Sequence, residues 1–90
     1  MGASGSPKEF AKAVGDGFVM LTVTSLRKFG TSEQLRELLV NIATVERETR
    51  NEVLEEDDFE GNRKKHFRLG NLRKARLIIQ GFAKSRRIPL

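Results

Sequence analysis

The sequence predicts an all-α domain, a small bundle of three to five helices, from three observations. Apolar residues recur every three or four positions from Leu35 to Val53, which is the spacing of one helical face. Gly30 followed by Thr31 places a helix stop beside a helix start. The one segment that could form a strand, between Gly17 and Phe29, has no second strand to pair with, so a sheet is not expected.

The first thirty residues predict a flexible lead followed by short helices. Residues 1–8 are expected to be disordered, and residues 9–90 to form one helical domain with an acidic first part and a basic C-terminal third. Phe10 to Val14 fits a helical turn, which Gly15-Asp16-Gly17 would end because glycine lets the backbone reverse. The segment from Gly17 to Phe29 is rich in β-branched residues and also suits a strand. Its periodicity favours a helix with an apolar face made of Phe18, Val19, Val23, Leu26 and Phe29.

The middle of the chain carries the clearest helix signal. Thr31 and Gln34 have the spacing of a capping box, in which each side chain bonds the backbone amide of the other. The acidic run from Glu55 to Asp58 follows this helix, and Phe59 to Asn62 is expected to be a turn. The apolar face of the helix consists of Leu35, Leu38, Leu39, Ile42, Val45, Thr49 and Val53.

The last third predicts two helices separated by a break. Arg63 to Leu69 would form the first, Gly70 would cap its end, and Asn71 would begin the next. The final helix is expected to run from Leu72 to about Arg86. Its apolar face consists of Leu72, Ala75, Ile78, Ile79, Phe82 and Ala83.

Composition excludes some classes of function and indicates in which cellular compartment the protein is expected. Without cysteine the chain has no disulfide, thiolate metal site or thiol nucleophile, and the cytoplasm or nucleus is the expected location. The longest apolar run, Phe18 to Leu21, is far shorter than the roughly 20 residues that cross a bilayer. Gly2 and Ser6 match the pattern for N-myristoylation, and a flexible tail or an expression remnant is the other interpretation.

Catalytic and metal-binding patterns are missing from the sequence. His66 is the only imidazole, its neighbours are cationic, and no carboxylate nearby would orient it. No nucleophile motif or phosphate-binding glycine loop occurs, so neither enzymatic activity nor a cofactor is expected. A calcium loop starting at Glu56 fails because its twelfth position, which requires Glu, is Phe67.

Charge divides the chain and points to an anionic partner. Residues 1–61 contain 7 Lys and Arg against 12 Asp and Glu, whereas residues 62–90 contain 10 Lys and Arg and no acid. Such segregation says more about partners than about fold. Four cations of the final helix fall within about 80° of arc beside the apolar face and form a row suited to successive phosphates: Arg73, Arg76, Lys84 and Arg87. The candidate nucleic-acid-binding residues are Arg63, Lys64, Lys65, Arg68, Arg73, Arg76, Lys84 and Arg87.

The expected function is therefore a binding module for nucleic acid, DNA or RNA, or for a ribonucleoprotein surface. Contacts would be mainly to the phosphate backbone, because few uncharged amides accompany the cations. One alternative is a protein-interaction or regulatory domain, a homodimer among the options, that pairs with an acidic protein surface. Another is a membrane-surface protein in which acylated Gly2 and the basic residues act together.

Overall fold

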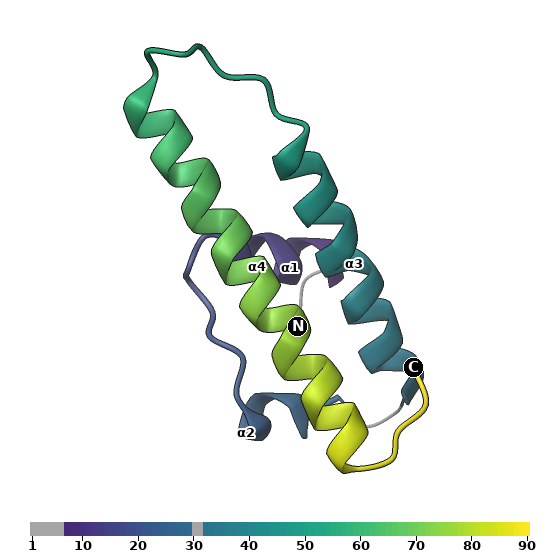
Figure 1. The fold of residues 1–90 in the computed structure, drawn as a ribbon. Coiled ribbons are helices and arrows are strands. Elements are labelled where there is room, and N and C mark those ends of the chain that lie inside the picture. Colours follow the sequence, from purple (N-terminus) through teal and green to yellow (C-terminus); the bar gives the residue numbers. More distant parts are fainter. Residues whose placement is uncertain (1–6, 30–31) are drawn as a thin grey trace.

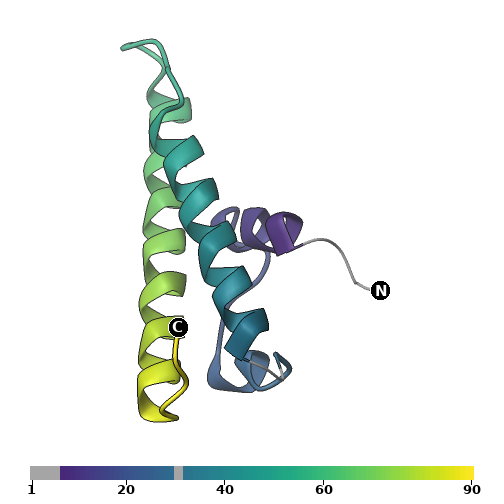
Figure 2. The ribbon, with the colours of Figure 1, turned by 90° about the vertical axis from the view of Figure 1, so that its right-hand side faces the viewer.

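In the computed structural model, the described residues are 7–29 and 32–90, and they form four helices and no strand. These are α1 (Pro7–Gly15), α2 (Val23–Leu26), α3 (Ser32–Arg50) and α4 (Phe59–Ser85). α3 and α4 form an antiparallel pair (Figure 1). Both α1 and α2 lie on one side of this pair, and no described helix covers the other side (Figure 2). The predicted all-α fold is confirmed.

The core lies between the α3–α4 pair and the first two helices. The molecule measures 45 × 28 × 18 Å, and its thinnest dimension corresponds to about two helix layers at about 8–10 Å between axes. The apolar faces predicted for the last two long helices are confirmed with two exceptions. Val53 is 93% exposed because α3 has already ended at Arg50, and Ile78 is 38% exposed at the edge of the buried face. The buried apolar residues are Ala11, Val14, Leu21, Leu26, Leu35, Leu38, Ile42, Val45, Leu72, Ala75, Ile79, Phe82 and Ala83.

The first helix begins earlier than predicted and ends where glycine was expected to end it. Pro7 and Lys8 are helical, while residues 1–6, which carry the acylation pattern, lie outside the described residues. At the other end, Gly17 has a φ of 84°, and the amide of Phe18 donates to the carbonyl of Ala13 at 3.0 Å. This is a Schellman motif, which places a left-handed residue after the helix.

The helix predicted between Gly17 and Phe29 is wrong for most of its length. The Schellman motif at Gly17 releases the chain in an extended conformation, and only four residues, Val23–Leu26, are helical. Successive side chains therefore alternate between the two sides of the segment. Leu21 is buried, whereas Phe18 and Met20 are each 82% exposed. The Thr22 hydroxyl accepts a hydrogen bond from the amide of Ser25 at 3.1 Å and caps the short α2.

The first turn of α4 occupies the segment that was predicted to be a turn. Asp58 is the N-cap, and its carboxylate accepts a hydrogen bond from the amide of Gly61 at 2.9 Å. Glu60 adds a negative charge to the first turn, where the positive end of the helix dipole favours it. The end of the acidic run is thus the start of a helix. Gly61 leaves room for the capping carboxylate of Asp58, because a side chain at position 61 would place its Cβ against that carboxylate.

The break predicted at Gly70 and Asn71 is absent, because α4 continues through both residues. Gly70 is exposed, and a Cβ added there would meet nothing within 4 Å. The helix therefore passes through this position without needing a glycine. The side chain of Asn71 does not cap a new helix. Its amide donates to the carbonyl of Gly15 at 3.0 Å, so it satisfies the end of α1 instead. Of the predicted start of α3, Gly30 and Thr31 lie outside the described residues.

Candidate functional site

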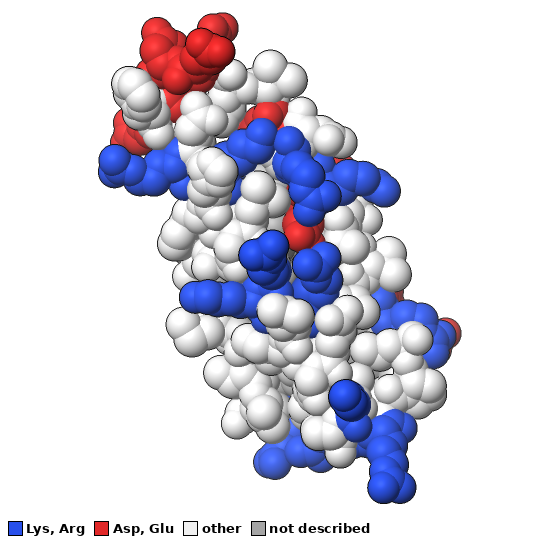
Figure 3. All heavy atoms as spheres, in the orientation of Figure 1, with Lys and Arg blue, Asp and Glu red and all other residues white. Residues whose placement is uncertain are grey.

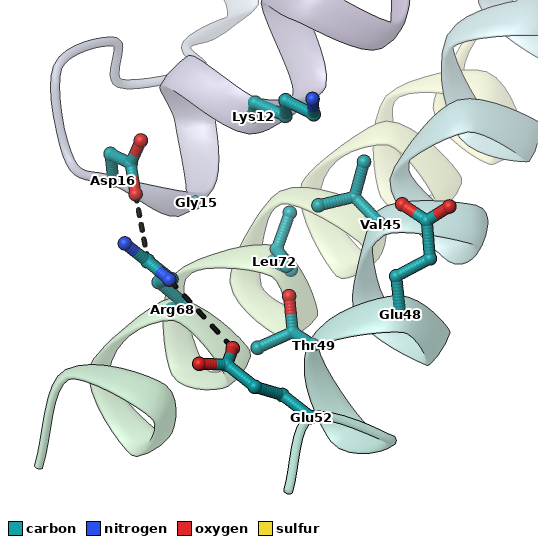
Figure 4. Close-up of a pocket in the computed structure, with 9 residues that line it drawn as sticks. All are labelled: Lys12, Gly15, Asp16, Val45, Glu48, Thr49, Glu52, Arg68 and Leu72. Carbon is teal, nitrogen blue, oxygen red and sulfur yellow. Dashed lines mark hydrogen bonds and ion pairs between the residues drawn. The ribbon is translucent and has the colours of Figure 1, made fainter. Parts of the chain in front are cut away.

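Two of the candidate cations, Arg68 and Lys65, hold the helices together on the side of α4 that faces α1 and α3. The Arg68 guanidinium lies 2.8 Å from the carboxylate of Asp16 and 4.0 Å from that of Glu52 (Figure 4). The Lys65 ammonium donates to the backbone carbonyl of Glu52 at 2.7 Å. These contacts tie α4 to the C-terminal ends of α1 and α3, so the two cations are already occupied.

The same region contains a cavity of about 260 Å³ between α1, α3 and α4 (Figure 4). Its charged groups have partners within the chain: Arg68 pairs with two carboxylates, and Glu48 pairs with Lys8 at 3.1 Å. Among the described residues, no three His, Asp or Glu side chains are grouped as metal ligands would be. The residues that line the cavity are Lys12, Gly15, Asp16, Val45, Glu48, Thr49, Glu52, Arg68 and Leu72.

A third candidate, Arg76, pairs with a buried carboxylate that sequence analysis missed. The side chain of Glu46 is 7% exposed, and its two oxygens lie 3.1 Å from Arg50 and 3.3 Å from Arg76. A buried carboxylate needs such partners because burial removes its hydration. Glu46 follows Ile42 by four residues, and this spacing could have placed it at the edge of the apolar face.

The remaining candidates are exposed and differ in their position relative to α4. Arg63, Arg73 and Lys84 belong to the helix and have no ion-pair partner among the described residues. Lys64 is also helical and exposed. Arg87 does not extend the predicted row, because α4 ends at Ser85 and Arg87 adopts a left-handed φ of 57°. The chain therefore turns away from the helix axis before Arg87.

A second Schellman motif explains the conformation of Arg87. The amide of Ile88 donates to the carbonyl of Ala83 at 2.8 Å, and the amide of Arg87 donates to that of Lys84 at 3.2 Å. Ile88 then packs against the hydrophobic core, which fixes the turn. The left-handed position usually belongs to glycine, so arginine there is strained.

The uncovered side of the α3–α4 pair also receives cations from α3. We call this side the open face and define it by Arg36, Arg47, Arg50, His66, Gly70, Arg73, Leu77 and Lys84. Arg36 and Arg47 lie within about 60° of helical arc of Arg50 at 100° per residue. Arg50 and Arg73 line opposite sides of a groove of about 300 Å³ between the helices. Its other lining residues are Glu46, His66, Leu69 and Gly70.

The distribution of charge along this side is uneven (Figure 3). Asp and Glu side chains gather at the end where α3 and α4 are joined, and Lys and Arg side chains extend from just below this acidic end to the end where α4 finishes, with an acidic group among them near the middle. The α3 arginines were overlooked because the first two thirds of the sequence is acidic on average. Of these arginines, Arg50 pairs with Glu46 of the same helix.

Comparison of the chain with protein-family models, with curated proteins and with solved structures yields no match. In the part of the chain that the structure describes, no helix is both long and apolar enough to cross a bilayer. A proposal for the function therefore rests on the arrangement of the side chains.

Proposed function

We propose that the chain is a non-enzymatic module that binds the phosphate backbone of nucleic acid through the open face. The observation that carries this proposal is the set of exposed cations from two helices, Arg47, Arg73 and Lys84, which have no internal partner among the described residues. An unpaired cation is available to displace counterions from a polyanion, and this release drives association.

The spacing of these cations supports backbone contacts. Arg73 and Lys84 are eleven residues apart on one helix, which corresponds to about 16 Å at about 1.5 Å per residue. A nucleic-acid strand advances about 3.4 Å per phosphate, so the two side chains span about five phosphates. Amide side chains are among those that read base edges, and the sequence has one, Gln80, between the two cations, so contacts to phosphates are favoured.

The test is a titration of the full chain with duplex DNA, structured RNA and anionic vesicles, each at several salt concentrations. The variant Arg47→Gln/Arg73→Gln/Lys84→Gln should bind the duplex more weakly. Its slope of log affinity against log salt should be smaller by about 0.9 for each phosphate that no longer meets a cation, or nearly 3 in total. Arg76 is left unchanged because its removal would leave an oxygen of Glu46 buried without a cation.

Two results would contradict the proposal. The first is that the wild-type chain binds neither nucleic acid at low salt. The second is that the folded triple variant binds as tightly as the wild type. Tighter binding to vesicles than to either nucleic acid would instead favour the membrane-surface alternative.

A further inference from the structure

A second surface, apolar rather than basic, lies where the extended segment after α1 runs beside α4. A groove of about 260 Å³ is formed there, and we call it the α4 side groove. Met20 is 82% exposed and Ile78 38% exposed along it. Large apolar side chains gathered at the surface mark interaction sites in soluble proteins. Its lining residues are Val14, Gly17, Val19, Met20, Leu21, Asn71, Lys74, Ala75 and Ile78.

Two aromatic side chains extend this apolar surface. Phe67 is 56% exposed and lies directly beside Gly17, where an added Cβ would be 3.1 Å from its ring. Phe18 follows Gly17 in the chain and is 82% exposed. The groove lining has one charged group, the ammonium of Lys74, and no carboxylate. A matching partner therefore presents apolar side chains together with negative charge.

The loop between α3 and α4 has this chemistry. We call residues 53–59 the tip, because they lie at the far end of the helix pair (Figure 1). Val53 is 93% exposed and Phe59 77% exposed, and between them stand four exposed acidic residues, 55–58. A partner that docks this segment can bury both apolar side chains and still meet the carboxylates with a cation.

Internal hydrogen bonds hold the tip in a defined shape. The side-chain amide of Asn62 donates to the carbonyls of Glu55 at 3.2 Å and Asp58 at 2.8 Å. The amide of Asp58 donates to the carbonyl of Glu55 at 3.1 Å. An ordered loop loses less conformational entropy on binding than a flexible one. The acidic residues 55–58 of the tip are thus held in a defined shape before a partner binds.

We propose that the tip of one molecule docks into the α4 side groove of a second copy of the chain. Apolar side chains of the tip cover the groove, and tip carboxylates approach Lys74. Because the two surfaces are different, the contact is head to tail, and it either closes into a dimer or ring or continues into a chain of molecules. Nucleic acid takes no part in this contact.

Sedimentation of the full chain without nucleic acid tests the proposal. The average mass should rise with protein concentration, and the effect should weaken at high salt because charge contributes to the contact. Met20→Asp in the groove and Val53→Asp in the tip should each weaken self-association by about tenfold or more, since each places a carboxylate against an apolar surface. Both positions are highly exposed, so both variants should fold. Val40→Asp, on an exposed position of α3, is the matched control and should associate like the wild type.

Mixing the two weakened variants gives the sharpest result. The Met20→Asp chain keeps an intact tip and the Val53→Asp chain keeps an intact groove, so the mixture should form a one-to-one complex that neither forms alone. A mixture that stays monomeric would overturn the pairing of tip with groove. A wild-type chain that stays monomeric at all concentrations would overturn the proposal.

Discussion

The two sides of the α3–α4 pair use their charges in different ways. On the side covered by α1, Arg68 binds Asp16, Lys8 binds Glu48, and the amide of Asn71 caps Gly15. On the open face, Glu46 pairs with two arginines, and the other cations remain exposed. Internal pairing therefore decides which cations remain available to a partner.

The two sides are also expected to contribute differently to stability and to binding. Exposed or half-exposed ion pairs contribute about 0 to 1 kcal/mol each, whereas burial of one large aliphatic side chain contributes about 1.5 to 3 kcal/mol. The covered side should therefore respond to changes in packing, and the open face should tolerate changes of charge, except at Glu46 and its partners.

The largest effect is expected from the apolar core. Ile79→Ala should lower the free energy of unfolding by about 2 to 5 kcal/mol, because Ile79 is fully buried and truncation leaves a cavity. Leu77→Ala, two residues earlier on the same helix and 57% exposed, is the matched control. Chemical denaturation measures both. Equal destabilisation of the two variants would contradict the assignment of Ile79 to the buried face of α4 and of Leu77 to its exposed face.

The next effect tests Glu46, a buried carboxylate next to the open face. Arg76→Gln should destabilise the fold by about 1 to 3 kcal/mol, because Oε1 of Glu46 is buried without a hydrogen bond and the Arg76 guanidinium at 3.3 Å is the cation that offsets its charge. Arg73→Gln should change stability by less than about 0.5 kcal/mol, as an exposed substitution without partners does. If thermal melts show the same stability for both variants, Glu46 is not held by Arg76.

A stabilising change is expected at the end of α4. Arg87→Gly should raise the free energy of unfolding by about 0.5 to 1 kcal/mol, because glycine relieves the left-handed strain at a φ of 57°. Arg86→Gly is the control, since Arg86 has a φ of −103° and gains nothing from glycine. Stabilisation at both positions, or at neither, would contradict the Schellman motif at Arg87.

An effect of similar size tests the continuity of α4. Gly70→Ala should stabilise the protein by about 0.5 to 1 kcal/mol, because alanine is the better helix former and its Cβ meets nothing within 4 Å. Gly17→Ala should destabilise it, since Gly17 has a φ of 84° and lies against Phe67. A loss of stability in Gly70→Ala would contradict a continuous α4 and would favour the helix break that the sequence predicts at Gly70.

The sequence predicted the helical class, most of the apolar faces of α3 and α4, and the end of α1, because these depend on local periodicity and on glycine. It failed where a tertiary contact decides the conformation. Asn71 is typical of a helix N-cap, but its side-chain amide donates to the carbonyl of Gly15 in α1. The segment after Gly17 packs Val19 and Leu21 against the core instead of forming a helix up to Val23. Among the candidate cations, the pairing of Arg68 with Asp16, 52 residues earlier, has no local signal.

The most direct measurement compares two variants that each remove two positive charges, from opposite sides of the molecule. Arg73→Gln/Lys84→Gln alters the open face, and Lys8→Gln/Lys12→Gln alters α1 on the covered side. With duplex DNA, the open-face variant should bind more weakly, with a salt slope smaller by about 2, while the α1 variant keeps the wild-type slope. An equal decrease of affinity in the two folded variants would show that binding follows net charge alone and would contradict the assignment of the open face.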